Sequence, residues 1–250
     1  MFTVINPEQS HRHAVETLTA LNRYQDFMDN IKIVADMGCG TGLDAEWWGR
    51  LTKDDGTSRN IQVNAIDRKL EWHSLSRNDN INYIEADFST SGLEPNSHDL
   101  VWAHNSLQYS LSPIGTLIHW HSILKPDGML LVTVPFNFKI YNNKDMLNVN
   151  STYTNGCYFN WTMGNLIMTL VGSGFDCRNG HFKIDKVNNW IQASVYKLPE
   201  EPNPYMNWYE MCDRKLLPLS VENSIMKTGN FDDIDIVVEW IDRTQYMLTV

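Results

Sequence analysis

The chain has 250 residues, of which 42% are hydrophobic and 20% are charged. This balance excludes disordered, collagen-like and coiled-coil proteins and is typical of one large globular domain or two small ones. There are 20 Lys and Arg against 30 Asp and Glu, so the formal net charge is −10. Such a chain repels a phosphate backbone at long range, and no basic run longer than Arg68-Lys69 or Arg214-Lys215 offsets the total. Nucleic acid is therefore a disfavoured partner.

The cysteines and the apolar residues indicate the compartment. Four cysteines lie far apart without a C-x-x-C pair, which argues against a zinc knuckle and against a disulfide framework. No basic segment followed by an apolar run opens the chain, and nowhere do 18 apolar residues follow one another. We therefore expect reduced thiols, no metal, no membrane insertion and a cytoplasmic protein.

Helix and strand signals alternate through the first half of the chain. Asn6-Pro7-Glu8-Gln9 has the N-cap Asn, first-turn Pro and capping-box Gln of a helix start, which predicts a leading helix within residues 1–30. Five short apolar segments predict buried strands, at residues 31–37, 61–67, 81–87, 98–103 and 129–134. The segments between them predict helices at residues 43–51, 68–78 and 113–124. This alternation predicts a parallel sheet with helices on both faces.

The pattern changes after Pro135. Residues 136–160 are rich in Asn and Tyr and lack periodicity, which indicates an insertion loop. A helix is predicted at residues 161–171, and segments 178–185 and 190–197 predict an antiparallel hairpin at the sheet edge. The proline-rich residues 199–204 then read as a linker. We expect one domain over residues 1–198 and a linker with a C-terminal extension over residues 199–250, where Ile234, Val237, Val238 and Ile241 keep helical spacing.

A glycine loop, Gly38-Cys39-Gly40-Thr41-Gly42, joins the first predicted strand to the helix that begins at Leu43. Glycines there let a ligand approach the main chain, with amide groups and the helix dipole facing it. The dinucleotide fingerprint G-x-G-x-x-G needs its third glycine where Leu43 stands, so the spacing argues against an NAD site.

Acidic residues end the next two predicted strands. Asp67 ends the second, where a carboxylate can accept both hydroxyls of a ribose, and Asp87 ends the third, followed by Phe88 as an aromatic wall suited to adenine. Open parallel sheets bind ligands at the carboxyl ends of their strands. The order of these features therefore predicts a nucleoside-containing ligand at one edge of the sheet.

A fourth motif is the turn before the fifth strand, Lys125-Pro126-Asp127-Gly128. Together, these ordered motifs resemble the class I S-adenosylmethionine-dependent methyltransferases, in particular the type 11 and quinone-biosynthesis branch. The resemblance covers about residues 31–197. The family's turn is commonly Lys-Pro-Gly-Gly, a departure that does not touch the cofactor. The resemblance implies an α/β fold, namely a Rossmann-like doubly wound, seven-stranded, mostly parallel sheet with an antiparallel edge hairpin, to which we add a helical C-terminal extension. It also implies S-adenosylmethionine as cofactor, with contacts from Asp36, Gly38, Gly40 and Gly42 to the methionine part, from Asp67 to the ribose, from Asp87 and Phe88 to adenine, and from the His104 main-chain carbonyl to the amino group. Arg68, next to Asp67, is a further candidate cofactor-binding residue.

The activity that the resemblance implies is transfer of a methyl group to an oxygen or nitrogen of a small molecule by direct displacement. Alignment of the reactants can contribute roughly 7–11 kcal/mol to such a reaction. His104 and Tyr109 are candidate catalytic bases for an acceptor that must lose a proton. DNA amino-methylating enzymes carry an Asn/Asp-Pro-Pro-Tyr/Phe element after the fourth strand, where this chain has His104-Asn105-Ser106-Leu107, and no Pro-Cys nucleophile occurs.

Two alternatives remain open at this point. One is an aminopropyltransferase on the same fold, and the other is a non-catalytic protein that keeps the fold and the cofactor and docks a partner. The C-terminal extension could shape the substrate site together with residues 136–160, or it could mediate a homodimer.

Overall fold

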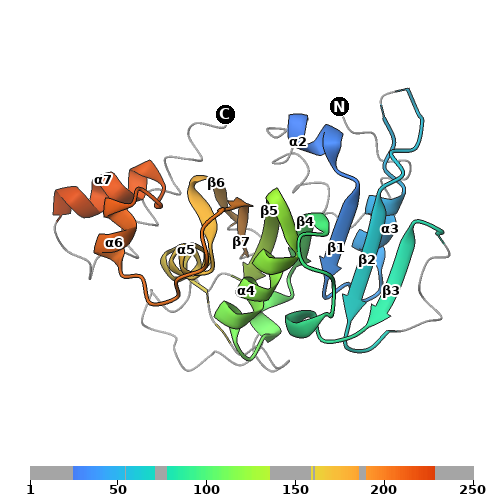
Figure 1. Ribbon diagram of the computed structural model, residues 1–250, viewed down its shortest axis with the longest axis horizontal. Helices are drawn as coiled ribbons and strands as arrows, with labels where there is room; N and C mark the ends of the chain where they lie inside the picture. The colour runs from blue at the N-terminus through green and yellow to red at the C-terminus, as the bar shows by residue number, and fades with distance from the viewer. Residues whose placement is uncertain are drawn as a thin grey trace.

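A seven-stranded sheet is the centre of the computed structural model, which describes residues 25–53, 55–70, 78–135, 159, 161–185 and 190–228 (Figure 1). The strand order is β3-β2-β1-β4-β5-β7-β6. The first five strands pair in parallel, and β7 runs antiparallel to both β5 and β6. The predicted doubly wound sheet and its edge hairpin are confirmed. The strands are β1 (Ile33–Met37), β2 (Gln62–Asp67), β3 (Ile81–Glu85), β4 (His98–His104), β5 (Leu124–Pro135), β6 (Phe175–Asp185) and β7 (Trp190–Lys197).

Helices cover both faces of the sheet (Figure 1). Pro113 opens the first turn of one helix, and Thr162 caps another through a capping box with Asn165. The helices are α2 (Gln25–Asn30), α3 (Leu43–Gly49), α4 (Pro113–Ile123), α5 (Met163–Gly172), α6 (Trp208–Asp213) and α7 (Leu219–Thr228), with two 3₁₀ turns, η2 (Phe88–Thr90) and η3 (Leu107–Tyr109).

The two faces of the sheet belong to separate hydrophobic cores, as the period of two in a strand requires. On one face Val101 of β4 packs with residues of α4 and α5, while on the other Leu100 and Trp102 pack with Trp47 and Trp48 of α3. No helix among the described residues is long and apolar enough to cross a membrane.

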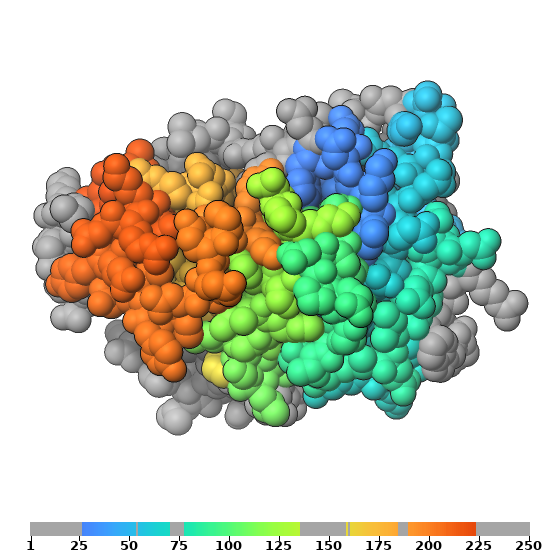
Figure 2. Space-filling model, viewed as in Figure 1, coloured from blue at the N-terminus to red at the C-terminus, as the bar shows by residue number. Residues whose placement is uncertain are grey.

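Two helices of the predicted helical C-terminal extension, α6 and α7, join the core on the α4 side. Met211 of α6 and Val221 of α7 are almost fully buried in it. Arg178 also links β6 to this segment, because its side chain contacts the Glu222 carboxylate and donates to the Leu217 carbonyl. In Figure 2 the orange to red atoms of the segment with α6 and α7 lie directly against those of the neighbouring segments. Residues up to 228 therefore pack on the domain instead of standing apart from it.

Several predicted boundaries differ from the structure. Residues 68–70 form a bend and a short connection where a helix was predicted, and residues 71–77 lie outside the described part. Strand β5 begins at Leu124 and not at residue 129, with a register shift opposite the start of β4 and with Asp127 at a φ of 62°. The helix start at residues 6–9, nearly all of the 136–160 loop and the helix around residues 234–241 also lie outside the described residues.

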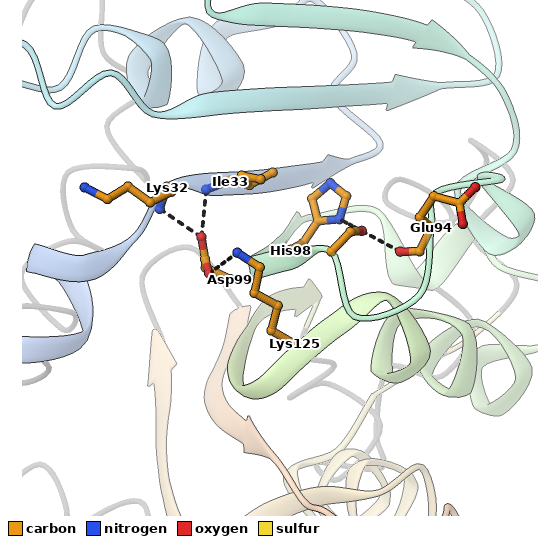
Figure 3. Close-up of polar contacts among 7 residues, drawn as sticks. Lys32, Ile33, Glu94, His98, Asp99 and Lys125 are labelled. Atoms are coloured by element: carbon orange, nitrogen blue, oxygen red, sulfur yellow. Dashed lines mark hydrogen bonds and ion pairs between the residues drawn. The ribbon is translucent and has the colours of Figure 1, made fainter.

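A polar cluster at the amino end of the sheet fixes how β1 and β4 meet (Figure 3). The Asp99 carboxylate accepts from the main-chain amides of Lys32 and Ile33 at 2.9 and 2.8 Å and from Lys125 Nζ at 2.7 Å. Next to it His98 is buried, and burial lowers its pKa to about 4. The cluster lies at the edge opposite the strand ends that carry the candidate site, so we assign it to stability.

Candidate functional site

The glycine loop is tied to the neighbouring strand at its first turn. The amides of Gly38 and Cys39 both donate to the Ile66 carbonyl of β2, at 2.8 and 2.9 Å. Gly38, Gly40 and Gly42 have φ angles of 84°, 52° and 77°, a left-handed region that other residues rarely adopt.

The loop has one closed and one open position. A Cβ on Gly38 would lie 2.5 Å from the Ser106 Cβ, whereas a Cβ on Gly40 would meet nothing within 4 Å. Gly38 is therefore required for packing against the segment after β4. At Gly40 the main chain borders open space, where a ligand can approach it.

Asp67 lies directly against this open position. Its Oδ2 accepts from the Gly40 amide at 2.9 Å and its Oδ1 from the Lys69 amide at 3.3 Å. Its main-chain carbonyl accepts from the Ala86 amide at 2.9 Å, which brings the end of β3 alongside. The structure thus brings the glycine loop and the ends of β2 and β3 together at one edge, with Arg68 exposed beside them.

Asp87 and Phe88 occupy different environments. Asp87 is exposed and caps η2, since its Oδ1 accepts from the Ser89 amide at 2.8 Å. The Phe88 ring is only 5% exposed, and its centroid lies 6.1 Å from that of Trp120. Because the ring belongs to the core, a contact of Phe88 with adenine would have to come from its main chain.

Three carboxylates gather beneath the loop. Asp36 at the end of β1 is 2% exposed, and its Oδ2 has no hydrogen-bond partner among the described residues. Burial, with the negative charges of Asp44 and Asp67, raises the pKa of Asp36 well above its usual range. Burial and the Asp36 charge also raise the pKa of the Cys39 thiol, so it is not a reactive thiolate. The negative charge of this region suits a cationic ligand.

His104, at the end of β4, is held by a residue that the sequence did not single out. Its Nδ1 lies 2.8 Å from Asp44 Oδ2, and the same oxygen accepts from Trp102 Nε1 at 3.0 Å. The His104 ring also contacts Trp190 of β7, with centroids 5.2 Å apart at 72°. No local pattern could reveal this group, because an acid in the first turn of a helix is explained by the helix dipole alone.

Tyr109, the other candidate base, lies in η3 and is half-buried against the core on the α4 side. His104 instead contacts Trp102, which belongs to the core on the α3 side. The two candidate bases therefore pack against different cores.

Two further polar residues stand in register with His104. Thr133 of β5 pairs with His104, and Gln192 of β7 pairs with Thr133. They are 3% and 8% exposed, yet Thr133 Oγ1 and Gln192 Nε2 have no hydrogen-bond partner among the described residues. Leaving a buried polar group unpaired costs about 1–3 kcal/mol, so such groups call for an explanation. A ligand with polar atoms beside His104 would supply one.

Metal ligands do not gather here: within the described ranges, no three His, Cys, Asp or Glu side chains are arranged to hold a metal ion.

Comparison with known proteins identifies the class of this domain. Residues 35–132 match the model of the methyltransferase domain family. A malonyl-[acyl-carrier protein] O-methyltransferase 2 from Coxiella burnetii is 31% identical over 106 residues, which make up 42% of this chain and 41% of that protein. The chain thus aligns with less than half of the relative's length.

Solved structures show the same fold at low sequence identity. A putative sarcosine dimethylglycine methyltransferase from Galdieria sulphuraria has a TM-score of 0.56 and 14% identity, covering 74% of this chain and 84% of its own. The [4+2]-cyclase SpnF has a TM-score of 0.54 and 17% identity, covering 76% of this chain and 83% of its own. One fold therefore accompanies different reactions, and the reaction has to be argued from the site.

The matched segment runs from β1 into β5 and contains the glycine loop, Asp67, Asp87 and His104. Residues 35–132 are thus similar to the methyltransferase domain family, which supports a class I S-adenosylmethionine-dependent methyltransferase with S-adenosylmethionine as the expected cofactor.

Proposed function

We propose that this chain transfers a methyl group from S-adenosylmethionine to an oxygen or nitrogen of a small molecule. The observation that carries the proposal is the hydrogen bond between the Gly40 amide and Asp67, next to the open space at Gly40. It joins an approachable main-chain bend and a strand-end acid at one edge of the sheet. The methionine part and the ribose of the cofactor require these two features side by side.

The residues present fit the cofactor's charge and its hydroxyls. The ammonium and sulfonium groups suit a crevice with Asp36, Asp44 and Asp67, where Asp36 Oδ2 has no partner among the residues described. A carboxylate offers about four acceptor positions, and the amides of Gly40 and Lys69 take two of those on Asp67. Two positions remain for the ribose hydroxyls.

The remaining cofactor roles stay proposals. Asp87 would accept from the adenine amine from its exposed position after β3, with Phe88 contributing main chain and Arg68 lying at the rim. Gly38 and Gly42 would shape the loop around the methionine part, and the His104 carbonyl would face the amino group. When bound, S-adenosylmethionine supplies an electrophilic methyl group on a positively charged sulfur.

The protein's main task is then to align the acceptor with that methyl group, which can contribute roughly 7–11 kcal/mol. The net charge of −10 favours a small acceptor over nucleic acid. The name of the Coxiella relative states O-methylation, which keeps oxygen among the proposed acceptor atoms.

We also propose a cytoplasmic location and, through residues 199–250, a homodimer. The described cysteines, Cys39, Cys177 and Cys212, are free, which suits a reducing compartment. Size-exclusion chromatography with light scattering at several protein concentrations tests the dimer.

Cofactor binding is the first test. Isothermal titration with S-adenosylmethionine and S-adenosylhomocysteine should show saturable binding, and Asp67→Ala should weaken it about 10- to 100-fold, the value of a lost hydrogen bond to a charged group. The matched control is Asp79→Ala, an exposed acid on a turn. Equal affinity in the wild type and Asp67→Ala would contradict the site.

Turnover separates the alternatives. Incubation with fractions of a metabolite extract should release S-adenosylhomocysteine together with a product heavier by one methyl group. Activity only with the decarboxylated cofactor would indicate an aminopropyltransferase. Tight cofactor binding without turnover in any fraction would favour a non-catalytic binding protein.

A further inference from the structure

We propose that His104 is the general base of the transfer, that Asp44 is the positioning residue that fixes its ring, and that the acceptor atom therefore carries a proton it must lose. The acceptor would be a hydroxyl or a protonated amine and not a carboxylate. This inference rests on the proposed methyl transfer and names its substrate class.

The hydrogen bonds define which ring nitrogen of His104 carries the proton. An indole N–H can only donate, so Asp44 Oδ2 must accept from Trp102 Nε1 at 3.0 Å. His104 Nδ1 lies 2.8 Å from the same oxygen. For Nδ1 to accept, Asp44 would have to be protonated on the oxygen that Trp102 already occupies. Nδ1 is therefore the donor, and in the neutral ring Nε2 keeps the lone pair that a base needs.

Asp36 supports the charge on Asp44. Burial and the neighbouring charges of Asp44 and Asp67 raise the pKa of Asp36, so Asp36 takes up a proton more readily than an ordinary carboxyl group. Asp44 stays an acceptor for both of its donors.

Aromatic rings hold His104 on two sides. The ring centroids of Trp102 and Trp190 lie 6.2 and 5.2 Å from that of His104, both edge-on, at 69° and 72°. The His104 side chain is only 8% exposed. The base is thus fixed in one orientation before an acceptor arrives.

The place that we propose for the acceptor's polar atoms follows from the strand register. His104 pairs with Thr133, and Thr133 with Gln192, at the edge where β4 and β5 end and β7 begins. Thr133 Oγ1 and Gln192 Nε2 are buried and have no hydrogen-bond partner in the part of the chain that the structure describes, so they can bind polar atoms of the acceptor. The charge of Asp44 disfavours a negative charge on the reacting atom, and a carboxylate would need no base.

The step balances without a further reactant. The acceptor's lone pair forms the bond to the methyl carbon, the carbon–sulfur bond breaks, and its electron pair stays on sulfur as a neutral thioether. The proton leaves the acceptor's oxygen or nitrogen for Nε2 of His104 and leaves the ring after the product has departed.

The first experiment reads the tautomer directly, without cofactor or activity. In ¹⁵N-labelled full-length protein, His104 assigned through His104→Gln should show the Nδ1–H form when neutral. Asp44→Asn should keep this form, because Trp102 can pair only with the amide oxygen and so holds that oxygen toward His104. Asp44→Ala should lose it. An Nε2–H ring in the wild type would overturn the proposal.

The second experiment measures the chemistry. His104→Gln should lower kcat ~10²- to 10⁴-fold with the affinity for S-adenosylmethionine within about 3-fold of the wild type. Asp44→Asn should retain part of kcat, and Asp44→Ala should lose it to the level of His104→Gln. His119→Gln, which changes a histidine bonded to Ser91, is the matched control and should leave kcat unchanged.

The outcomes distinguish this inference from the proposed function. If the wild type neither binds the cofactor nor releases S-adenosylhomocysteine, the proposed function fails. If the wild type turns over but His104→Gln keeps its kcat, or if the acceptor atom is a carboxylate oxygen, the base assignment fails and methyl transfer stands.

Discussion

Replacing Gly38 by Ala should destabilise the protein through two effects whose sizes the structure separates. The first is the left-handed main chain at a φ of 84°, which costs an L-residue about 1–2 kcal/mol. The second is steric, because the new Cβ would lie 2.5 Å from the Ser106 Cβ. Ordinary carbon contacts are about 3.5–4.0 Å, so the segment after β4 must shift, at about 1–3 kcal/mol. We expect a total loss of about 2–5 kcal/mol.

Gly56→Ala isolates the first effect. Gly56 has a φ of 81°, close to that of Gly38, but a Cβ there would meet nothing within 4 Å. Urea denaturation should show a loss of about 1–2 kcal/mol for Gly56→Ala and about 1–3 kcal/mol more for Gly38→Ala. Ser106→Gly in the Gly38→Ala background should recover the steric part and no more.

Gly40→Ala completes the series, since its φ of 52° and open surroundings predict only the main-chain cost. Its added methyl group instead enters the open space that we propose for the cofactor, so cofactor binding should weaken by more than the change in stability explains. The reasoning is refuted if Gly38→Ala costs no more than Gly56→Ala, or if Ser106→Gly recovers nothing.

Further predictions concern the rest of the sheet. Burial lowers the pKa of His98 to about 4, below its ordinary value of about 6.5, so the unfolded state binds more protons between these two pH values. Acidification from pH 6.5 to 4 should therefore remove up to about 3 kcal/mol of stability. His98→Gln should flatten this pH dependence of the unfolding free energy. Asp99→Ala leaves the amides of Lys32 and Ile33 without their acceptor, so it should lower the free energy of unfolding by about 2–3 kcal/mol in urea denaturation. Titration should show that the affinity for the cofactor stays unchanged. Gln192→Leu removes an unpaired buried amide, so it should leave stability equal or raise it by about 1 kcal/mol yet raise the acceptor KM; a lower KM would speak against the acceptor position.

The deletion that tests the C-terminal extension has to respect the core. Removing residues 205–250 would strip Met206, Met211 and Val221 from the core on the α4 side, and the fold should be lost with them. Removing residues 229–250 leaves these contacts in place. If the extension mediates the dimer or shapes the acceptor site through those last residues, the shorter deletion should give a monomer or an inactive protein that still binds cofactor.

The sequence determined the architecture because its information is local. Apolar strands in alternation with helical segments require a parallel sheet, and parallel strands bring their carboxyl ends to one edge. The glycine loop, Asp67 and the end of β3 could therefore be predicted to lie together from the sequence alone. The hairpin β6–β7 was likewise readable from two short apolar segments with a short connection.

Tertiary structure alone decided which side chains act together. Asp44 and His104 are 60 residues apart, and their contact follows from how α3 packs on β4. The sequence predicted that the Phe88 ring would face adenine, but the ring packs against Trp120, 32 residues later, whose Nε1 donates to the Phe88 carbonyl. Strand register put Thr133 and Gln192 beside His104, and a shift of one residue would have turned both to the other face. Local patterns fix elements and their ends, whereas the pairing of distant residues depends on packing that no local pattern contains.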